Sequence, residues 1–393
     1  MKTLRDLGEL DGKRVLVRVD FNAPLDSEGN VADDTRIRAA LPTIEELRRR
    51  GARLVLASHL GRPKDREPGL SLRPVADCLS KLTEADVTLA PGVVGEDVRA
   101  FSEKLGPGDV LVLENVRFEP GETKNDPELA RALASLADVY VNDAFGAAHR
   151  AHASTAGVAG FLGEHAAGLL LEREVAMLSG LLKAPDRPLV MVLGGAKVSD
   201  KIGLIERFLL IDCAILIGGA MAFAFSGSAG QKLAPSLVSA QDVQLARNLI
   251  DATSTRNTPA SIGLPKDVVV ADRFAADAQT RVIEGVDGPA GWLGVDIGPR
   301  TAQAYARSIT EAKTVFWNGP MGAFELEPFA AGTRAVAQAV AECEGTTVVG
   351  GGDSAAALTK FGLADRVTHL STGGGASLKL VEGYSLPGVE ALA

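Results

Sequence analysis

The chain has 393 residues and is poor in several residue types that mark particular classes of protein. It contains only three cysteines, Cys78, Cys213 and Cys343, which are odd in number and far apart, so we expect neither a disulfide framework nor a cysteine metal site. Aromatic residues account for 5% of the chain. The hydrophobic core must therefore consist mainly of Val, Leu, Ile and Ala.

Long hydrophobic runs are also lacking, because charged residues or glycines interrupt every apolar stretch before it could span a membrane. Residues 1–9 contain no apolar segment of the kind found in a secretory signal. The formal net charge of -9 argues against a nucleic-acid-binding surface over the whole protein. We expect a cytoplasmic protein without a membrane or nucleic-acid partner.

What the chain does contain is a regular alternation of short apolar runs with segments of helical periodicity. This alternation is typical of βαβ units and parallel sheets. The runs are too many for one open sheet, so the sequence predicts an α/β protein with two Rossmann-like, doubly wound parallel-sheet domains. A (β/α)₈ barrel is the alternative. The expected strands are 14–19, 52–57, 110–113, 139–141, 188–193, 214–217, 268–270, 314–317 and 346–349.

A joint between two domains is expected near residues 168–187. Residues 169–182 have helical spacing, and the two prolines of segment 183–188 interrupt the helix before the next strand. A helix that joins two domains would act as a hinge. An ordinary crossover helix would have the same sequence pattern.

The segment 193–201, Leu-Gly-Gly-Ala-Lys-Val-Ser-Asp-Lys, lies between an expected strand and an expected helix. Its glycines let the backbone approach a ligand, and the helix N-terminus adds unpaired N–H groups. Lys197 and Lys201 add two ammonium groups, so this turn is a candidate phosphate site, although the chain has no Walker A pattern. An ordinary turn with two solvated lysines is the alternative.

Polar and basic side chains follow the strands of the first half of the chain. Ligands of open α/β sheets bind at the carboxyl ends of the strands, where these side chains would meet. Arginine binds carboxylate and phosphate groups through paired hydrogen bonds, so such a cluster favours a small polyanion. The residues concerned include Asp20, Asn22, His59, Arg62, Arg117, His149, Arg150 and His152, with Arg36 and Arg38 at the start of the first expected helix.

Glycine takes the corresponding positions in the second half, in the turns 218–219, 318–322, 350–354 and 371–375. Such turns suit a nucleotide, and Asp353 could hold Mg²⁺ that bridges phosphates. A polyanion domain and a nucleotide domain together indicate phosphoryl transfer, with domain closure excluding water. No carboxylate or histidine stands out as a base, which suits an acceptor that is already ionised.

A series of longer motifs stands in order along nearly the whole chain. They are 18–24 (RVDFNAP), 34–37 (DTRI), 58–63 (SHLGRP), 114–118 (ENVRF), 142–146 (NDAFG), 149–155 (HRAHAST), 193–201 (LGGAKVSDK), 317–322 (WNGPMG), 350–354 (GGGDS) and 371–377 (STGGGAS). In these motifs the chain resembles the phosphoglycerate kinase family. Several of them are long and family-specific, so chance convergence does not explain the match.

The resemblance implies reversible, Mg²⁺-dependent, in-line phosphoryl transfer between 1,3-bisphosphoglycerate with ADP and 3-phosphoglycerate with ATP, on domain closure, in a glycolytic enzyme expected to be a monomer. It implies a 3-phosphoglycerate domain over 1–168, an interdomain helix over 169–185 and a nucleotide domain over 186–376. A C-terminal tail, 377–393, would pack back onto the first domain. The triose would be held by Asp20, Asn22, Arg36, His59, Arg62, Arg117 and Arg150.

The same resemblance assigns the transfer and nucleotide sites. Arg36, Lys197, Lys201, Gly373 and Gly374 would act at the transferring phosphoryl group. Glu325 would hold the ribose and Asp353 would serve Mg²⁺. The nucleotide-binding residues would be Lys201, Gly218, Gly219, Gly294, Val295, Asn318, Glu325, Gly352, Asp353 and Ser354.

Two segments depart from the family pattern. In 226–235, Ala234 and Pro235 stand where a Gly-Lys pair is usual, which bears on contacts at the outer edge of the nucleotide. Segment 253–262 is irregular and is expected at the surface.

Two other classes of protein compete with a kinase. A nicotinamide-dependent oxidoreductase would need a G-x-G-x-x-G turn with an acidic residue at the end of the next strand, and that pairing is not found. A two-lobed anion-binding protein would not need Lys197, Lys201 and Asp353 together. Fold alone would not separate these classes, so the site residues must.

Overall fold

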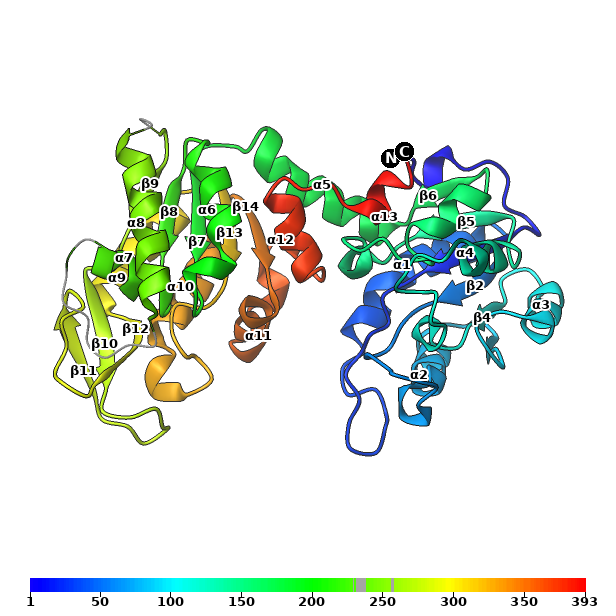
Figure 1. The fold of residues 1–393 in the computed structure, drawn as a ribbon, viewed down its shortest axis with the longest axis horizontal. Coiled ribbons are helices and arrows are strands. Elements are labelled where there is room, and N and C mark those ends of the chain that lie inside the picture. The colour runs from blue at the N-terminus through cyan, green and yellow to red at the C-terminus, as the bar shows by residue number, and fades with distance from the viewer. Residues whose placement is uncertain (229, 231–237, 256–257) are drawn as a thin grey trace. The chain divides into compact units, whose positions relative to one another are not determined.

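The computed structural model describes residues 1–228, 230, 238–255 and 258–393. The chain divides into two compact units (Figure 1): the first unit is Met1–Ala176 with Tyr384–Ala393, and the second unit is Met177–Gly383. Helix α5 (Leu169–Lys183) crosses from the first unit to the second. The irregular segments 226–235 and 253–262 lie partly outside the described residues. In the described part of the chain, no helix is both long and apolar enough to cross a membrane.

A parallel sheet with the strand order β3-β4-β2-β1-β5-β6 forms the centre of the first unit. The chain starts near the middle of this sheet, so the order reverses between β1 and β5. The strands are β1 (Arg14–Arg18), β2 (Arg53–Ala57), β3 (Val87–Leu89), β4 (Val110–Val112), β5 (Val139–Asn142) and β6 (His165–Ala167).

Both faces of this sheet are covered, as is usual for parallel sheets. Val15 and Val17 belong to one buried cluster with the apolar side chains of α1 (Thr35–Arg49) and α2 (Arg73–Leu82). Leu16 points to the opposite face, because successive side chains of a strand alternate, and it is buried as well. The remaining helices of this unit are α3 (Glu96–Glu103), α4 (Pro127–Ala134) and α13 (Pro387–Glu390).

The two ends of the chain meet in the first unit, as Figure 1 shows. The Lys2 N–H donates to the carbonyl of Leu392 at 3.0 Å. The Asn142 amide donates to the carbonyl of Gly388, in α13, at 3.1 Å. The last ten residues therefore pack against the end of β5.

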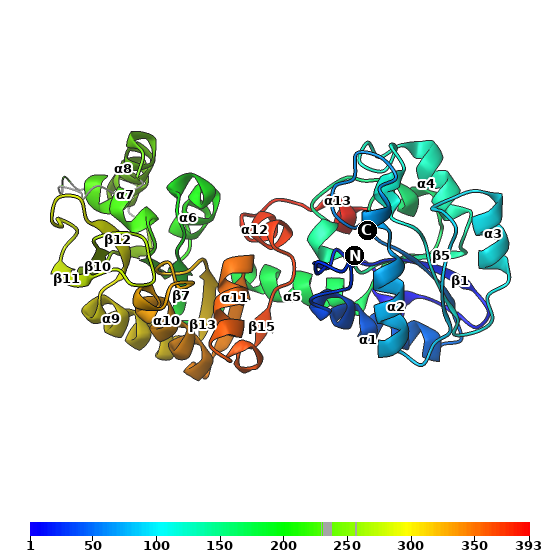
Figure 2. The same cartoon turned by 90° about the horizontal axis from the view of Figure 1, so that it is seen from below.

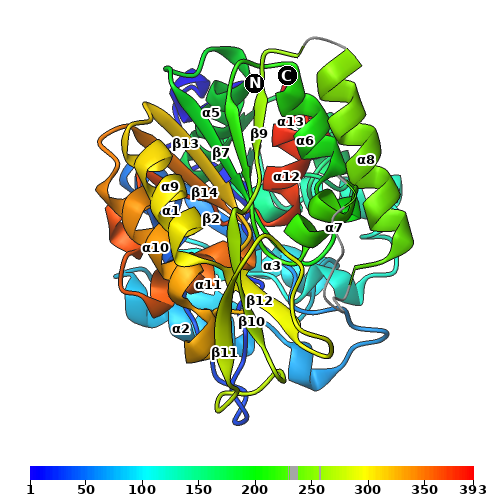
Figure 3. The same ribbon diagram turned by 90° about the vertical axis from the view of Figure 1, so that its left-hand side faces the viewer.

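The second unit contains another six-stranded parallel sheet, with the order β15-β14-β13-β7-β8-β9. Helices α9, α10 and α11 cover one face, and α6 and α8 cover the other (Figure 2 and Figure 3). The strands are β7 (Leu189–Leu193), β8 (Ala214–Ile217), β9 (Ser261–Gly263), β13 (Thr314–Asn318), β14 (Thr346–Gly350) and β15 (His369–Leu370). The helices are α6 (Ile202–Leu209), α7 (Met221–Ser228), α8 (Ala240–Thr255), α9 (Pro299–Thr310), α10 (Ala331–Glu342), α11 (Gly352–Lys360) and α12 (Gly375–Val381).

The two doubly wound sheets confirm the predicted fold class and exclude the barrel. The expectation that strand 268–270 belongs to a parallel sheet is wrong. It forms β10 (Asp267–Ala271) at the centre of a three-stranded antiparallel sheet, between β11 (Thr280–Glu284) and β12 (Leu293–Ile297). An antiparallel sheet can leave one face in solvent, and β11 is largely exposed, so it lacks the apolar run by which a buried strand is recognised.

Candidate functional site

The first candidate site lies at the reversal of strand order in the first unit, where β1 and β5 end. Open α/β sheets bind ligands at such a point because the connections leave in opposite directions and open a crevice. Asp20 follows β1, and Gly146 follows β5. A side chain at Gly146 would collide with the Asp20 carboxylate and approach Arg36, so the close approach requires glycine here.

Asp20 connects two of the predicted substrate residues. Arg36, at the start of α1, donates to Asp20 Oδ2. The His59 ring nitrogen Nδ1 lies 3.8 Å from Asp20 Oδ1, and both side chains are about nine-tenths buried. Asn22 accepts the Gly61 N–H through its Oδ1 at 2.8 Å, which holds the turn after β2 in place.

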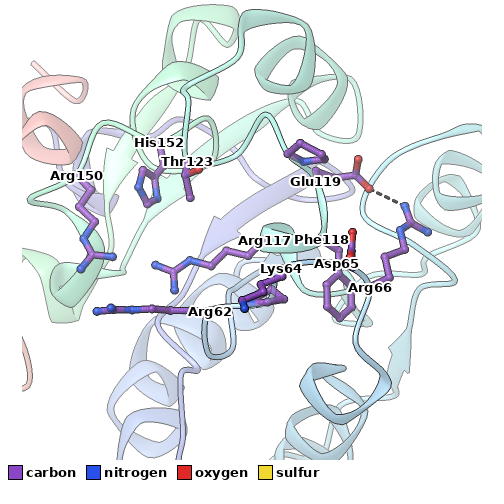
Figure 4. Close-up of a pocket in the computed structure, with 12 residues that line it drawn as sticks. Arg62, Lys64, Asp65, Arg66, Arg117, Phe118, Glu119, Thr123, Arg150 and His152 are labelled. Atoms are coloured by element: carbon purple, nitrogen blue, oxygen red, sulfur yellow. Dashed lines mark hydrogen bonds and ion pairs between the residues drawn. The ribbon is translucent and has the colours of Figure 1, made fainter.

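Three further predicted residues, Arg62, Arg117 and Arg150, line a pocket of about 420 Å³. Their guanidinium groups point into the same part of the pocket (Figure 4), although the residues come from three different loops. Arg117 also donates to the Gly61 carbonyl, which joins it to the turn held by Asn22. The structure therefore brings three of the four predicted substrate arginines into one pocket, and Arg36 lies outside its lining.

Burial and the positive charge of this cluster together determine the protonation state of His59. Burial, reinforced by Arg18 and Arg117, holds the pKa of His59 well below its usual value, so the imidazole is neutral near pH 7. Arg18 Nη2 lies 3.2 Å from His59 Nδ1. An arginine can only donate, so we assign the His59 proton to Nε2.

Arg18 was not among the predicted site residues, and neither were Ser154 and Glu122, to which it connects the predicted residue His59. It is 1% exposed and donates to the Ser154 hydroxyl at 2.7 Å. That hydroxyl in turn donates to the buried Glu122 carboxylate at 2.6 Å. Although burial acts to raise it, the pKa of Glu122 stays below its usual value because His152, Arg18 and Ser154 stabilise the ionised form. Nothing in the sequence indicated that Arg18 is buried, because a charged residue within a strand pattern is ordinarily expected to face solvent.

The second candidate site lies at the reversal of strand order in the second unit, between β7 and β13. Here the backbones after the two strands cross: the Gly194 N–H donates to the Asn318 carbonyl at 3.0 Å, and the Gly195 N–H to the Pro320 carbonyl at 3.2 Å. A side chain at Gly194 or Gly219 would strike neighbouring backbone atoms. The close contact between these backbones therefore requires glycine at both positions, whether or not a ligand is bound.

Lys201 lies beside this crossing and donates to the Asn318 side-chain oxygen. Asn318 is held in turn, since its amide donates to the Gly350 carbonyl at 2.7 Å. The Ser354 hydroxyl accepts the Gly319 N–H at 2.6 Å. Burial lowers the pKa of Lys201 from its usual value, while Asp200 and Asp353 act in the opposite direction.

A pocket of about 260 Å³ opens next to these residues. It brings together five of the predicted nucleotide residues, and it adds aromatic and aliphatic side chains that the sequence did not single out. The predicted residues in its lining are Gly219, Gly294, Val295, Glu325 and Asp353, and the added ones include Phe223, Phe274 and Leu293.

The remaining predicted residues of the second unit are outside this lining. Gly218 packs against Met321, and Gly352 begins α11. Lys197 is exposed at the start of the turn Val198–Asp200. Gly373 and Gly374 precede α12, and the Gly373 N–H donates to the Ser371 hydroxyl at 3.2 Å.

Two aromatic side chains, Phe223 and Phe274, contribute to the lining of this pocket. Gly294 faces the Phe223 ring so closely that a side chain would overlap it. Phe274 is exposed and lies 5.6 Å, between ring centroids, from Phe329. Phe274 could not be singled out from the sequence, because a lone aromatic residue in an irregular segment has no periodic pattern.

The candidate metal ligand is a single carboxylate. Asp353 lies exposed in the first turn of α11 and lines the pocket. Among the residues that the structure describes, no three His, Cys, Asp or Glu side chains gather around a common point. This arrangement suits Mg²⁺, which is commonly bound through one or two carboxylates together with substrate phosphates.

Comparisons with known proteins agree on one family. The family model described as phosphoglycerate kinase matches residues 4–384. The phosphoglycerate kinase of Herpetosiphon aurantiacus is 54% identical over 392 residues, covering 100% of this chain and 98% of that protein. The cytosolic phosphoglycerate kinase of Triticum aestivum is 50% identical with the same coverage.

Solved structures give the same result. The structure of phosphoglycerate kinase from Coxiella burnetii is similar at a TM-score of 0.89 and 41% identity, covering 99% of this chain and 98% of that one. The structure from Pyrococcus horikoshii is similar at a TM-score of 0.84 and 32% identity, covering 100% and 98%.

Proposed function

This chain belongs to the phosphoglycerate kinase family and is a kinase of glycolysis, and we propose that its two pockets divide the substrates of the reaction between the two units. The first unit binds 3-phosphoglycerate or 1,3-bisphosphoglycerate. The second unit binds ADP or ATP with Mg²⁺. The observation that carries this division is the contrast between an arginine pocket at one strand-order reversal and a glycine-lined pocket at the other.

The triose is recognised by charge and by fixed donors. Arg62, Arg117 and Arg150 offer paired donors to the phosphate and carboxylate groups. Neutral His59 offers the Nε2 proton, and Asp20 and Asn22 complete the group. Asp20 also holds Arg36 at the start of α1, where it acts on the transferring phosphoryl group.

The nucleotide is recognised by shape at the base and by charge at the phosphates. The part of the pocket lined by Phe223, Gly294 and Val295 takes the adenine, and Glu325 accepts hydrogen bonds from the ribose. Lys197 and Lys201 neutralise phosphate charge, and Asn318 and Ser354 keep the surrounding turns in place. Asp353 is the protein ligand of Mg²⁺, which neutralises charge on the phosphates.

Transfer then depends on positioning and charge, because the acceptor carboxylate of 3-phosphoglycerate is already ionised and needs no base. Arg36, Lys197, Lys201 and the turn at Gly373 and Gly374 stabilise the charge on the phosphoryl group in flight. Direct transfer requires the two ligands to meet, so closure of the units during turnover, with α5 as the hinge, is part of the proposal. We also propose a cytoplasmic monomer without nucleic-acid or membrane partners, in keeping with its net charge of -9.

The proposal is tested with 3-phosphoglycerate, ATP and Mg²⁺, by coupling formation of 1,3-bisphosphoglycerate to a dehydrogenase and following the loss of NADH. We expect turnover in the wild type and a loss of about a hundredfold or more in Lys197→Ala, because removal of one charge-stabilising donor has an effect of this size. Circular dichroism serves as the folding control. A folded wild-type protein without turnover would favour the anion-binding alternative.

A further inference from the structure

Lys360, the last residue of α11, holds the backbone of the segment that carries Glu325. Its ammonium group donates to the carbonyl of Phe324 at 2.8 Å and to the carbonyl of Glu325 at 3.1 Å. The same ammonium lies 5.8 Å from the centroid of the Phe324 ring, close enough for a cation–π contact. One side chain therefore contacts this segment at three points.

The segment that Lys360 holds forms one wall of the nucleotide pocket. Ala323 and Glu325 line the pocket, whereas the buried Phe324 between them points into the protein and packs edge-on against Phe361, with centroids 6.3 Å apart. The Glu325 side chain is exposed, so the backbone held by Lys360 is the anchor from which its carboxylate reaches the pocket. Fixing the two carbonyls limits the movement of that carboxylate.

Helix α11 connects this contact to the phosphate end of the pocket. Asp353 lies in its first turn, and Lys360 is its last residue. A helix is a rigid spacer, so the carboxylate proposed for Mg²⁺ and the clamp on Glu325 are held at a fixed separation. The phosphates and the ribose of a bound nucleoside diphosphate lie apart, so the groups that bind them must be held apart as well.

We propose that Lys360 is a positioning residue for ribose recognition, which acts by fixing the Glu325 backbone. This inference rests on the proposed function, in which Glu325 accepts hydrogen bonds from the ribose. Lys360 does not touch the nucleotide. It determines how well the pocket distinguishes a ribonucleotide from one without ribose hydroxyls.

Binding measurements by calorimetry test this without any need for turnover. ADP and 2′,3′-dideoxy-ADP are titrated into wild type, Lys360→Met, Glu325→Ala and the double variant. We expect the preference of the wild type for ADP to fall by about three- to tenfold in Lys360→Met, the range for weakening of an ordinary hydrogen bond, because Lys360 acts on the ribose only through Glu325. The affinity for dideoxy-ADP should stay within about twofold. The double variant should show the same preference as Glu325→Ala.

Arg334 provides a matched control. It is also a cation over a neighbouring ring, 5.0 Å from the centroid of Phe361, and it donates to Glu327 at 2.8 Å. Arg334→Met should leave the preference for ADP unchanged. Lys360→Arg, which keeps a cationic donor, should retain most of the preference. If Lys360→Met does not fold, Lys360→Gln, whose shorter side chain keeps an uncharged amide donor, should give an intermediate preference.

The possible results separate the two proposals. Equal weakening of both nucleotides in the Lys360 variant would mean a general structural role and would overturn the inference, as would an unchanged preference. A further loss of preference in the double variant would show that Lys360 does not act through Glu325 and would also overturn it. Failure of the proposed function would appear in the wild type, as no binding of ADP, and would overturn both.

Discussion

Among single side chains, Asp296 on β12 has an environment that makes its ionisation important for stability. Its Oδ2 accepts the Gly332 N–H at 2.6 Å and its Oδ1 accepts the Ile297 N–H at 2.9 Å. Gly322 and Gly332 face the carboxylate so closely that neither could carry a side chain. Burial raises the pKa of Asp296 to about 7, although both N–H groups act to lower it.

The raised pKa predicts how Asp296→Asn changes the pH dependence of stability. The unfolded chain loses this proton near the ordinary value of 3.8, whereas the folded protein keeps it up to about 7, so raising the pH through this window destabilises the fold. An asparagine does not titrate and lacks this loss. Between about pH 5 and about pH 8, the free energy of unfolding of the variant should therefore increase by roughly 3 kcal/mol relative to that of the wild type, because each pKa unit corresponds to about 1.36 kcal/mol.

Denaturant unfolding followed by tryptophan fluorescence measures this effect, since both tryptophans, Trp292 and Trp317, lie in the same unit as Asp296. The buried Trp317 on β13 makes the signal sensitive to packing of that unit. If the free energies of unfolding of wild type and variant change in parallel between about pH 5 and about pH 8, the raised pKa of Asp296 is contradicted.

Among the elements, helix α5 is held at its N-terminus by side chains that are distant from it in the sequence. The N–H groups of Leu170 and Leu171 donate to Asp143 Oδ1 at 2.9 and 3.2 Å, and the Leu169 N–H donates to the Thr43 hydroxyl at 2.9 Å. Asp143 follows β5 and is completely buried. A side chain at Gly168 would overlap the Asp143 carboxylate, so this approach requires glycine.

We predict that Asp143→Ala destabilises the protein by about 2–4 kcal/mol, because a helix cap is lost and buried N–H groups lose their acceptor. Asp143→Asn, which keeps the acceptor oxygen, should have a smaller effect. Hydrogen exchange resolves the cause, since the loss of protection should be greatest in residues 165–175. A uniform loss over the whole unit would point to a general packing defect.

The sequence predicted the long buried strands and the helix α5 correctly because continuous apolar runs and helical spacing mark such elements. It did not predict β3, β6, β9 and β15, which have only two or three residues, or β11 and β12, the outer strands of the antiparallel sheet. Arginines at strand ends were predicted as a cluster from topology alone. Arg18 was missed, because burial of a charged side chain depends on partners such as Ser154 that the fold brings from elsewhere.

For the whole molecule, the division of ligands between the units predicts where each ligand protects the backbone. Hydrogen exchange measured with ADP and Mg²⁺ should slow in the second unit, and with 3-phosphoglycerate in the first, because a ligand stabilises only the folded state that binds it. At a ligand concentration of 100 Kd the stabilisation is about 2.7 kcal/mol, enough to be seen in each unit.

The linking helix α5 supplies the last test, since it belongs in part to each unit. If closure during turnover bends the chain there, exchange in α5 should change with ADP and 3-phosphoglycerate together, a pair that cannot react, and with neither alone. Inorganic phosphate in place of 3-phosphoglycerate serves as the control for charge. Equal protection of both units by ADP alone would contradict the division of sites, and an unchanged α5 with both ligands bound would place the hinge elsewhere in the chain.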